Sequence, residues 1–247
     1  MKMITEINAE MLDFRALGES VRAAEGDIRI KNCLGQRFIG AGSGVRRIEI
    51  HGVPGNALGA YLNGAEIEVY GSAQDAVGDT MNAGEIIIHG SIGDTAGYAM
   101  RGGKIIVEKN AGYRAGVHMK SYEEKKPVLV IGGSAGSFLG EYQAGGIIIV
   151  LGLNSDKPIV SNFPCTGMHG GKLFLRSDCS DILFPKQVTA RRAQNEEMEE
   201  IIPYLREYCT IFGTELDVVL RHPFTLVTPD SKNPYKQMYV KNWGNTA

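Results

Sequence analysis

The chain has little of several residue types on which common functions depend. Its 247 residues include four cysteines and one tryptophan, and 26 lysines and arginines nearly balance 28 aspartates and glutamates. A net charge of −2 without a basic block provides no electrostatic footprint for nucleic acid or for a membrane surface. No apolar run approaches the roughly 18 residues of a membrane-spanning helix. We therefore expect no nucleic acid and no membrane among its partners.

The cysteines and the N-terminus bear on location. Cys33, Cys165, Cys179 and Cys209 are scattered along the chain, without the Cys-x-x-Cys spacing of zinc and redox sites. Such a distribution is typical of thiols that stay reduced. The first residues, MKMITEINAEMLDF, contain no apolar run of signal-peptide length. These absences predict a cytoplasmic protein.

Glycine is abundant, and the glycines are periodic. Four segments align with a constant period of 19 residues, beginning at Arg47, Glu66, Glu85 and Lys104. Each opens with two apolar residues separated by one, as at Ile48 and Ile50, which predicts a short strand with one buried face. A glycine recurs in the same place of four successive units, at Gly59, Gly78, Gly97 and Gly116. This column indicates turns in which a side chain would clash or φ is positive.

A unit of this size cannot bury its own apolar face, so successive units must stack and share a core. The apolar pair also recurs outside the four segments, at Ile28/Ile30, Leu129/Ile131, Ile148/Val150 and Leu173/Leu175. We predict an all-β fold, a right-handed parallel β-helix of about seven or eight coils. A left-handed hexapeptide helix is the competing fold. It is disfavoured because its six-residue repeat gives about 18 residues per coil.

Two insertions interrupt the repeat, at 122–127 and at 154–164, and solenoids place such insertions in loops at the side. The residue between each apolar pair points outward, and it changes along the stack from charged to apolar. The series is Glu49, Glu68, Ile87, Ile106, Val130 and Ile149. An apolar outer strip of this length has to be covered, either by the C-terminal segment or by a partner.

The pattern divides the chain into three parts. Residues 1–25 are predicted to be an N-terminal capping helix, because apolar residues between Asn8 and Ala24 recur at helical spacing. Residues 26–176 form the β-helix. Residues 177–247 are predicted to be a C-terminal helical extension that packs on the solenoid or on a partner.

Within the C-terminal part, the sequence predicts two helices and an edge strand. The first helix runs from Asn195, its expected N-cap, to Cys209, with a kink or a late start at Pro203. The second begins at Thr214, spaced from Asp217 like a capping box. An edge strand at 224–227 and a polar tail at 229–247 follow.

Two columns of chemically interesting side chains have structural explanations. A methionine column, comprising Leu62, Met81, Met100, Met119, Gln143 and Met168, would suit a soft metal, but flexible thioethers that fill an irregular core are favoured. His51 and His89 share a second column, with Tyr70 between them and Glu108 after them. Since two coils separate them by about 10 Å, they cannot share a metal, and we interpret them as solvated turn residues. Cys165 and His169 would need two more ligands, so neither a metal site nor an iron–sulfur cluster is predicted.

Carboxylates and nucleophiles lead to the same conclusion. Asn56, Asp75 and Asp94 stack at one turn, as the acids of polysaccharide-cleaving β-helices do, but side chains of this type at turns ordinarily bond to the local backbone. Ser134 lies in a Gly-Gly-Ser-Ala-Gly turn without a strand-to-helix elbow. No glycine-rich segment opens a helix within a βαβ unit, as a dinucleotide site requires. We therefore assign no catalytic, cofactor-binding or metal-binding residue, and no cofactor.

Several motifs together resemble the glycine-repeat domain at the C-terminus of the glutamate synthase large subunit. They are Gly35-Gln36-Arg37 with Gly40, the turns from Gly90 to Gly97, Gly102-Gly103, Val130 to Gly133, Tyr142 with Gly145-Gly146, and Gly167-Met168 with Gly170-Gly171. The resemblance covers most of the chain. Formylmethanofuran dehydrogenase carries a similar β-helical subunit.

The resemblance implies a structural role. In glutamate synthase, a glutaminase domain releases ammonia and an FMN and iron–sulfur domain adds it to 2-oxoglutarate, while the β-helix holds these parts together. This chain begins Met-Lys-Met and so lacks the N-terminal cysteine nucleophile of the glutaminase. The expectation is a non-catalytic scaffold subunit of a split glutamate synthase that docks glutaminase and FMN synthase subunits. A formylmethanofuran dehydrogenase-type subunit and a carbohydrate-active enzyme remain as alternatives, and a second copy of the chain is retained among the candidate partners.

Overall fold

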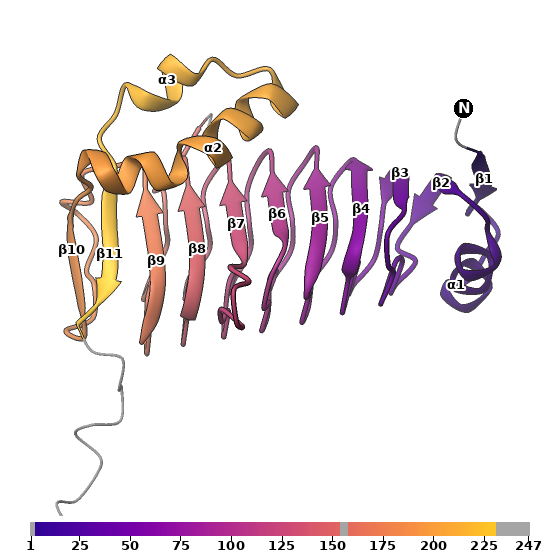
Figure 1. The fold of residues 1–247 in the computed structure, drawn as a ribbon, viewed down its shortest axis with the longest axis horizontal. Helices are drawn as coiled ribbons and strands as arrows, with labels where there is room; N and C mark the ends of the chain where they lie inside the picture. Colours follow the sequence, from indigo (N-terminus) through magenta and orange to yellow (C-terminus); the bar gives the residue numbers. More distant parts are fainter. Residues whose placement is uncertain (1–2, 154–157, 231–247) are drawn as a thin grey trace, which may run out of the picture.

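The computed structural model describes residues 3–153 and 158–230. Figure 1 shows the strands side by side along one axis, in a single 11-stranded sheet with the order β1 to β9, then β11, then β10. The strands are β1 (Ile4–Asn8), β2 (Asp27–Leu34), β3 (Arg47–Val53), β4 (Asn63–Tyr70), β5 (Ala83–Ile88), β6 (Lys104–Val107), β7 (Val128–Ile131), β8 (Ala144–Val150), β9 (Gly170–Leu175), β10 (Val188–Arg192) and β11 (Thr225–Pro229). Every neighbouring pair from β1 to β9 is parallel, which confirms the predicted parallel β-solenoid.

The register places each apolar residue of a strand on its counterpart in the next coil. Ile48 pairs with Ile67, and Ile67 pairs with Ile86, so the buried side chains form continuous ladders. Lys104 pairs with Val128, and the ladder therefore absorbs the first insertion without losing register. The inner face is apolar in every coil because the period of the sequence equals the length of one coil.

The corner of each coil uses an unusual backbone conformation. In one coil the φ angles of Ala76, Gly78 and Thr80 are +57°, +67° and +52°, and the coils on either side repeat this alternation. A Cβ atom at Gly78 would lie 2.5 Å from Cδ1 of Ile105, so the end of that side chain would have to move, and glycine also avoids the strain of a positive φ. Close packing and a positive φ together favour glycine at this position of the column.

The N-terminal end differs from the prediction. Residues 4–8 are a strand, β1, which extends the parallel ladder by one step beyond β2. The helix α1 (Phe14–Ala23) begins later than predicted, and Asp13 caps it by accepting hydrogen bonds from the amides of Arg15 and Ala16. Figure 1 shows α1 beside the first coils, where Leu17 and Val21 are buried. The predicted helix began too early because Met11 was counted in its apolar stripe, whereas Met11 lies before α1 and is 91% exposed.

The first C-terminal helix is longer than predicted. Helix α2 (Asn195–Phe212) is capped by Gln194, not Asn195. It passes through Pro203 and ends at Phe212, with Gly213 as its C-cap. Proline in a helix interior costs about 3 kcal/mol. The buried side chains of Ile201 and Leu205 lie on either side of it, and their packing offsets that cost.

The second helix and the last strand also need corrections. Helix α3 (Leu216–Leu220) is preceded by Glu215 without a side-chain cap, so the predicted Thr214–Asp217 capping box is wrong. Strand β11 is not an edge strand, because it lies between β9 and β10 and pairs antiparallel with both. Strand β10, which forms the edge at this end of the sheet, was not predicted. Most of the predicted polar tail, 231–247, lies outside the described residues.

The core has two parts. One fills the inside of the solenoid, and the other lies between the outer face of the sheet and the helices α2 and α3. In the second part, Ile106, Val130 and Ile149 are fully buried with Ile201 and Leu205 of α2. Figure 1 shows α2 crossing this part of the sheet. The chain's own C-terminal segment therefore covers the apolar strip at Ile106, Val130 and Ile149, and a partner cannot dock on these residues unless α2 moves.

Candidate functional site

The methionine column is buried core. Met81, Met100 and Met119 are fully buried, and Met168 is 1% exposed. Gln143, the exception in the column, is also fully buried, and its Nε2 donates to the carbonyl oxygens of Gly145 (3.2 Å) and Gly146 (3.3 Å). The polar substitution is therefore anchored to the backbone. The methionine column therefore fills the interior of the coils, as we predicted from the flexibility of thioether side chains.

The stacked Asx residues bond to the backbone of the next coil. Oδ1 of Asn56 accepts from the amide of Asp75 at 3.3 Å, Oδ1 of Asp75 accepts from Asp94 at 2.9 Å, and Oδ1 of Asp94 accepts from Tyr113 at 2.8 Å. Each side chain thus satisfies a backbone donor that the corner leaves unpaired within its own coil. These hydrogen bonds between coils give Asn56, Asp75 and Asp94 a structural role.

The histidine column differs from its interpretation as solvated turn residues. His51 lies within β3 and His89 directly follows β5, and both rings stack on Tyr70, with centroids 4.9 and 4.8 Å apart. His89 also meets the ring of Phe212, the last residue of α2, edge to face at 5.2 Å. The interpretation is wrong for His89, because the end of α2 covers its ring.

Carboxylates complete the surroundings of the histidine column. Nε2 of His51 lies 2.7 Å from Glu49, and Nε2 of His89 lies 3.0 Å from Glu68. Glu68 also accepts from Arg47 at 2.6 Å. The column is thus part of a polar network on the outer face of the first coils.

The thiols are buried and poorly suited to nucleophilic chemistry. Burial raises the pKa of Cys33 to about 11 and that of Cys165 to about 12. His169 is occupied locally, since its Nδ1 lies 3.0 Å from the carbonyl oxygen of Gly167. Within residues 3–153 and 158–230, no three His, Cys, Asp or Glu side chains are grouped so that they could hold a metal ion. Ser134 is buried, and its hydroxyl lies 3.1 Å from Oδ1 of Asn110.

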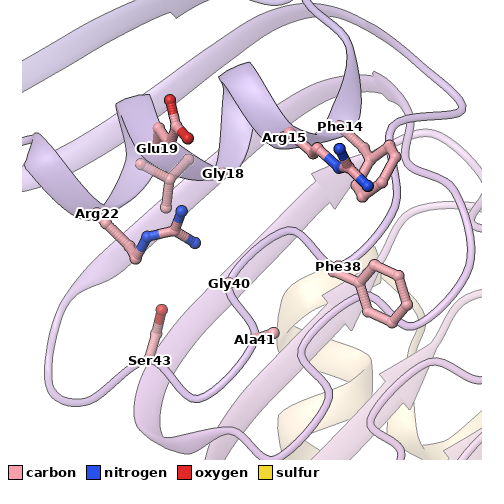
Figure 2. A pocket seen from close by; sticks show the side chains of 10 residues that line it. Phe14, Arg15, Gly18, Glu19, Arg22, Phe38, Gly40, Ala41 and Ser43 are labelled. Atoms are coloured by element: carbon pink, nitrogen blue, oxygen red, sulfur yellow. The ribbon is translucent and has the colours of Figure 1, made fainter.

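A hollow between α1 and the first corner is a packing gap. Its volume is about 250 Å³, below the roughly 300 to 1,000 Å³ of ligand sites. Figure 2 shows Arg15 beside the ring of Phe14 on the helix, with Phe38 across the gap on the first coil. The two rings are 6.3 Å apart between centroids, and the guanidinium of Arg37 lies 4.8 Å from the Phe14 ring. These contacts hold α1 against the solenoid.

Two rows of aromatic side chains lie on the corner turns of the later coils, and we call them the aromatic rows. The first contains Tyr98, His118 and Tyr142, and the second contains Tyr113, Phe138 and Phe163. Neighbouring rings are 5.1 to 6.0 Å apart between centroids. All except the half-buried Phe138 are exposed, and Phe163 is exposed by 61%.

Arg114 packs against two rings of the second row. Its guanidinium lies 5.0 Å from the ring of Tyr113 and 5.7 Å from the ring of Phe138, in the range of cation–π contacts. Its Nε lies 2.8 Å from Oε2 of Glu141, whose side chain is 7% exposed and which precedes Tyr142 of the first row. A buried carboxylate thus holds the arginine against the second row.

The composition of the aromatic rows is that of a protein interface. Tyrosine, phenylalanine and arginine are enriched in interfaces, because they offer large contact areas at a low cost in conformational entropy. The rows stand on stacked coils whose backbone is fixed by hydrogen bonds between coils. The sequence shows no continuous aromatic column, because each row joins two columns of the repeat, as where Tyr113 lies beside Phe138. Only the folded corner brings those columns together.

Comparisons with known proteins agree with the geometry of the fold. A family model described as the GXGXG motif matches residues 21–229. The uncharacterized protein MJ1350 of Methanocaldococcus jannaschii is 41% identical over 249 residues, which cover 95% of each chain. Among the described helices, none has the length and apolar character needed to span a bilayer. The chain therefore belongs to the GXGXG motif family, the family of the glycine-repeat domain at the C-terminal end of glutamate synthase.

Proposed function

We propose that this chain is a non-catalytic scaffold subunit of a split glutamate synthase. In this role it holds together a glutaminase subunit and an FMN and iron–sulfur synthase subunit, which convert glutamine and 2-oxoglutarate to glutamate. Membership of the GXGXG family over residues 21–229 supports the proposal. The interior of the coils is packed with fully buried side chains, as a rigid support requires.

The aromatic rows are the observation that carries the proposal. They present exposed rings and one held arginine on a face that no other described segment covers. The apolar strip, which suggested a docking surface from sequence, is occupied by α2. A partner subunit therefore docks on the corner turns that carry the aromatic rows. Phe163 is the most exposed ring of these rows.

Co-purification from the native cells tests the assignment. The tagged chain is expected to recover a glutaminase with an N-terminal cysteine and a flavin protein with iron–sulfur clusters, in fixed proportions. The recovered complex is expected to form glutamate from glutamine and 2-oxoglutarate. Recovery of molybdenum or tungsten formyl-oxidising subunits instead would assign the chain to a formylmethanofuran dehydrogenase-type complex.

A pair of variants tests the surface separately. Phe163→Ser removes an aromatic ring from the rows, and Tyr122→Ser removes a similarly exposed ring (52%) from the first insertion, outside the rows. We expect Phe163→Ser to lose at least one partner and Tyr122→Ser to retain both. If the two variants recover both partners equally well, the aromatic rows are not the docking surface.

A further inference from the structure

A cleft on the side of the solenoid collects positive charge where the first insertion interrupts the repeat. Its volume is about 580 Å³, within the range of small-molecule sites. Lys120 and Lys126 line it from the two ends of the insertion, and Lys172 of β9 and the preceding His169 line it from the later coils. Among the described residues in its lining, Glu200 of α2 is the one carboxylate. The chain as a whole has a net charge of −2, so this concentration of cations is a local feature.

The insertion builds one wall of the cleft. It folds back on itself as a tight hairpin, in which Tyr122 and Lys125 exchange backbone hydrogen bonds of 3.2 and 3.0 Å. Figure 1 shows this curl at the foot of β7. Glu123 and Glu124 are exposed on the hairpin and do not line the cleft. The wall therefore presents lysine and not glutamate to the interior of the cleft.

The floor of the cleft has few side chains. It includes the glycine pairs that open β8 and β9, 145–146 and 170–171. A Cβ atom at Gly146 would lie 2.5 Å from the carbonyl oxygen of Pro127, so the close approach of the coils requires glycine there. A bare floor leaves the space between the lysines open to a ligand.

The polar groups around the cleft can serve an anion. Nζ of Lys172 lies 2.5 Å from Oε2 of Glu200, whereas Lys120 and Lys126 make no ion pair with a described carboxylate. Oγ of Ser121 accepts from the amide of Gly146 at 2.9 Å, so its hydroxyl hydrogen can donate to a ligand. Three ammonium groups thus face one carboxylate. Bringing like charges together costs free energy, and an anion between them recovers it.

We propose that this cleft binds a small polyanion with at least two oxyanion groups, either carboxylates or phosphates. Ammonium groups on flexible stems recognise such groups as point charges and adapt to their positions. Glu200 competes with the ligand for Lys172. This inference goes beyond the proposed scaffold role, since it concerns a ligand site whose lining residues are not members of the aromatic rows.

Isothermal titration calorimetry of the whole chain tests the proposal, with pyrophosphate as the phosphate probe and citrate as the carboxylate probe. We expect at least one of them to bind, and the tighter one identifies the source of the oxyanions. Binding is expected to weaken as NaCl is added, because the contacts are between exposed charges. Lys126→Gln is expected to weaken binding about tenfold, the effect of one charge-assisted hydrogen bond. Glu200→Gln is expected to tighten it, because Lys172 is released.

Lys125→Gln is the matched control. It removes the same charge from the adjacent residue of the hairpin, but Lys125 does not line the cleft. We expect its affinity to equal that of the unmodified chain. Equal losses in Lys125→Gln and Lys126→Gln would show diffuse attraction and overturn the proposal, as would the absence of binding of both probes at millimolar concentration. Unfolding midpoints measured without ligand verify that each variant folds. If Lys126→Gln does not fold, Lys120→Gln takes its place in the experiment.

Discussion

Replacing Gly78 with alanine measures how tightly the corner of the solenoid is packed. The backbone there has φ of +67°, and alanine in this left-handed region costs about 1 kcal/mol more than glycine. The added Cβ would lie 2.5 Å from Cδ1 of Ile105, a fully buried side chain. Overpacking of this kind costs about 1 to 3 kcal/mol. Gly78→Ala is therefore expected to lower the free energy of unfolding by about 2 to 4 kcal/mol.

Gly97 is the matched control for this experiment. It occupies the same column with φ of +68°, but a Cβ atom there would have its nearest neighbours at 3.9 Å. Gly97→Ala therefore carries the backbone cost of about 1 kcal/mol without the steric cost. Urea unfolding followed by circular dichroism gives both values. If Gly78→Ala destabilises the chain no more than Gly97→Ala does, the interior is not close-packed at this corner.

A double-mutant cycle isolates the clash itself. Ile105→Val removes the Cδ1 atom that the new Cβ would meet, and alone it is expected to cost about 1 kcal/mol. In the Gly78→Ala background the same change should cost less or should stabilise the chain, because it opens space for the methyl group. Strict additivity of the two changes would contradict the steric explanation.

Three further predictions concern the C-terminal helix and the Asx ladder. Leu205→Ala is expected to lower the free energy of unfolding by about 2 to 5 kcal/mol, because Leu205 is fully buried between helix and sheet. Hydrogen exchange should become faster in α2 than in the coils. Equal acceleration throughout the chain would contradict separate docking of α2. Asp94→Ala is expected to cost about 1 kcal/mol, because it deprives the amide of Tyr113 of its acceptor, whereas Asp94→Asn retains the acceptor and should unfold at nearly the unmodified urea concentration. The hydrogen bonds from Arg191 and from the amide of Gln194 lower the pKa of Glu197 from 4.5 to about 2. Since the pKa is lower in the folded chain, Glu197 stabilises the fold above pH 4.5, and this contribution is lost as the pH falls towards about 2. Glu197→Gln should flatten the pH dependence of the unfolding midpoint over that range, and an unchanged slope would contradict the assignment.

The repeat was predictable because its period is local information. Residues one coil apart carry the same backbone task, so the apolar pair at Ile48 and Ile50 and the glycines of the corner recur at a fixed interval whatever the rest of the chain does. Burial of the methionine column followed from the same logic. The strands at the two ends of the sheet, β1 and β10, do not belong to the 19-residue repeat, so no periodic pattern in the sequence predicted them.

Sequence by itself therefore determined the period, the inner face and the stacking of coils, since a short unit with one apolar face can be buried only by its neighbours. Only the tertiary structure decided what covers the outer strip, where α2 and not a partner packs on Ile106, Val130 and Ile149. It also distinguished Gly78 from Gly97, which are identical in the column but differ in the space around them. The aromatic rows and the lysine cleft likewise join residues from different columns. Such contacts depend on distances between side chains of neighbouring coils, and these distances cannot be obtained from the spacing of residues in the sequence.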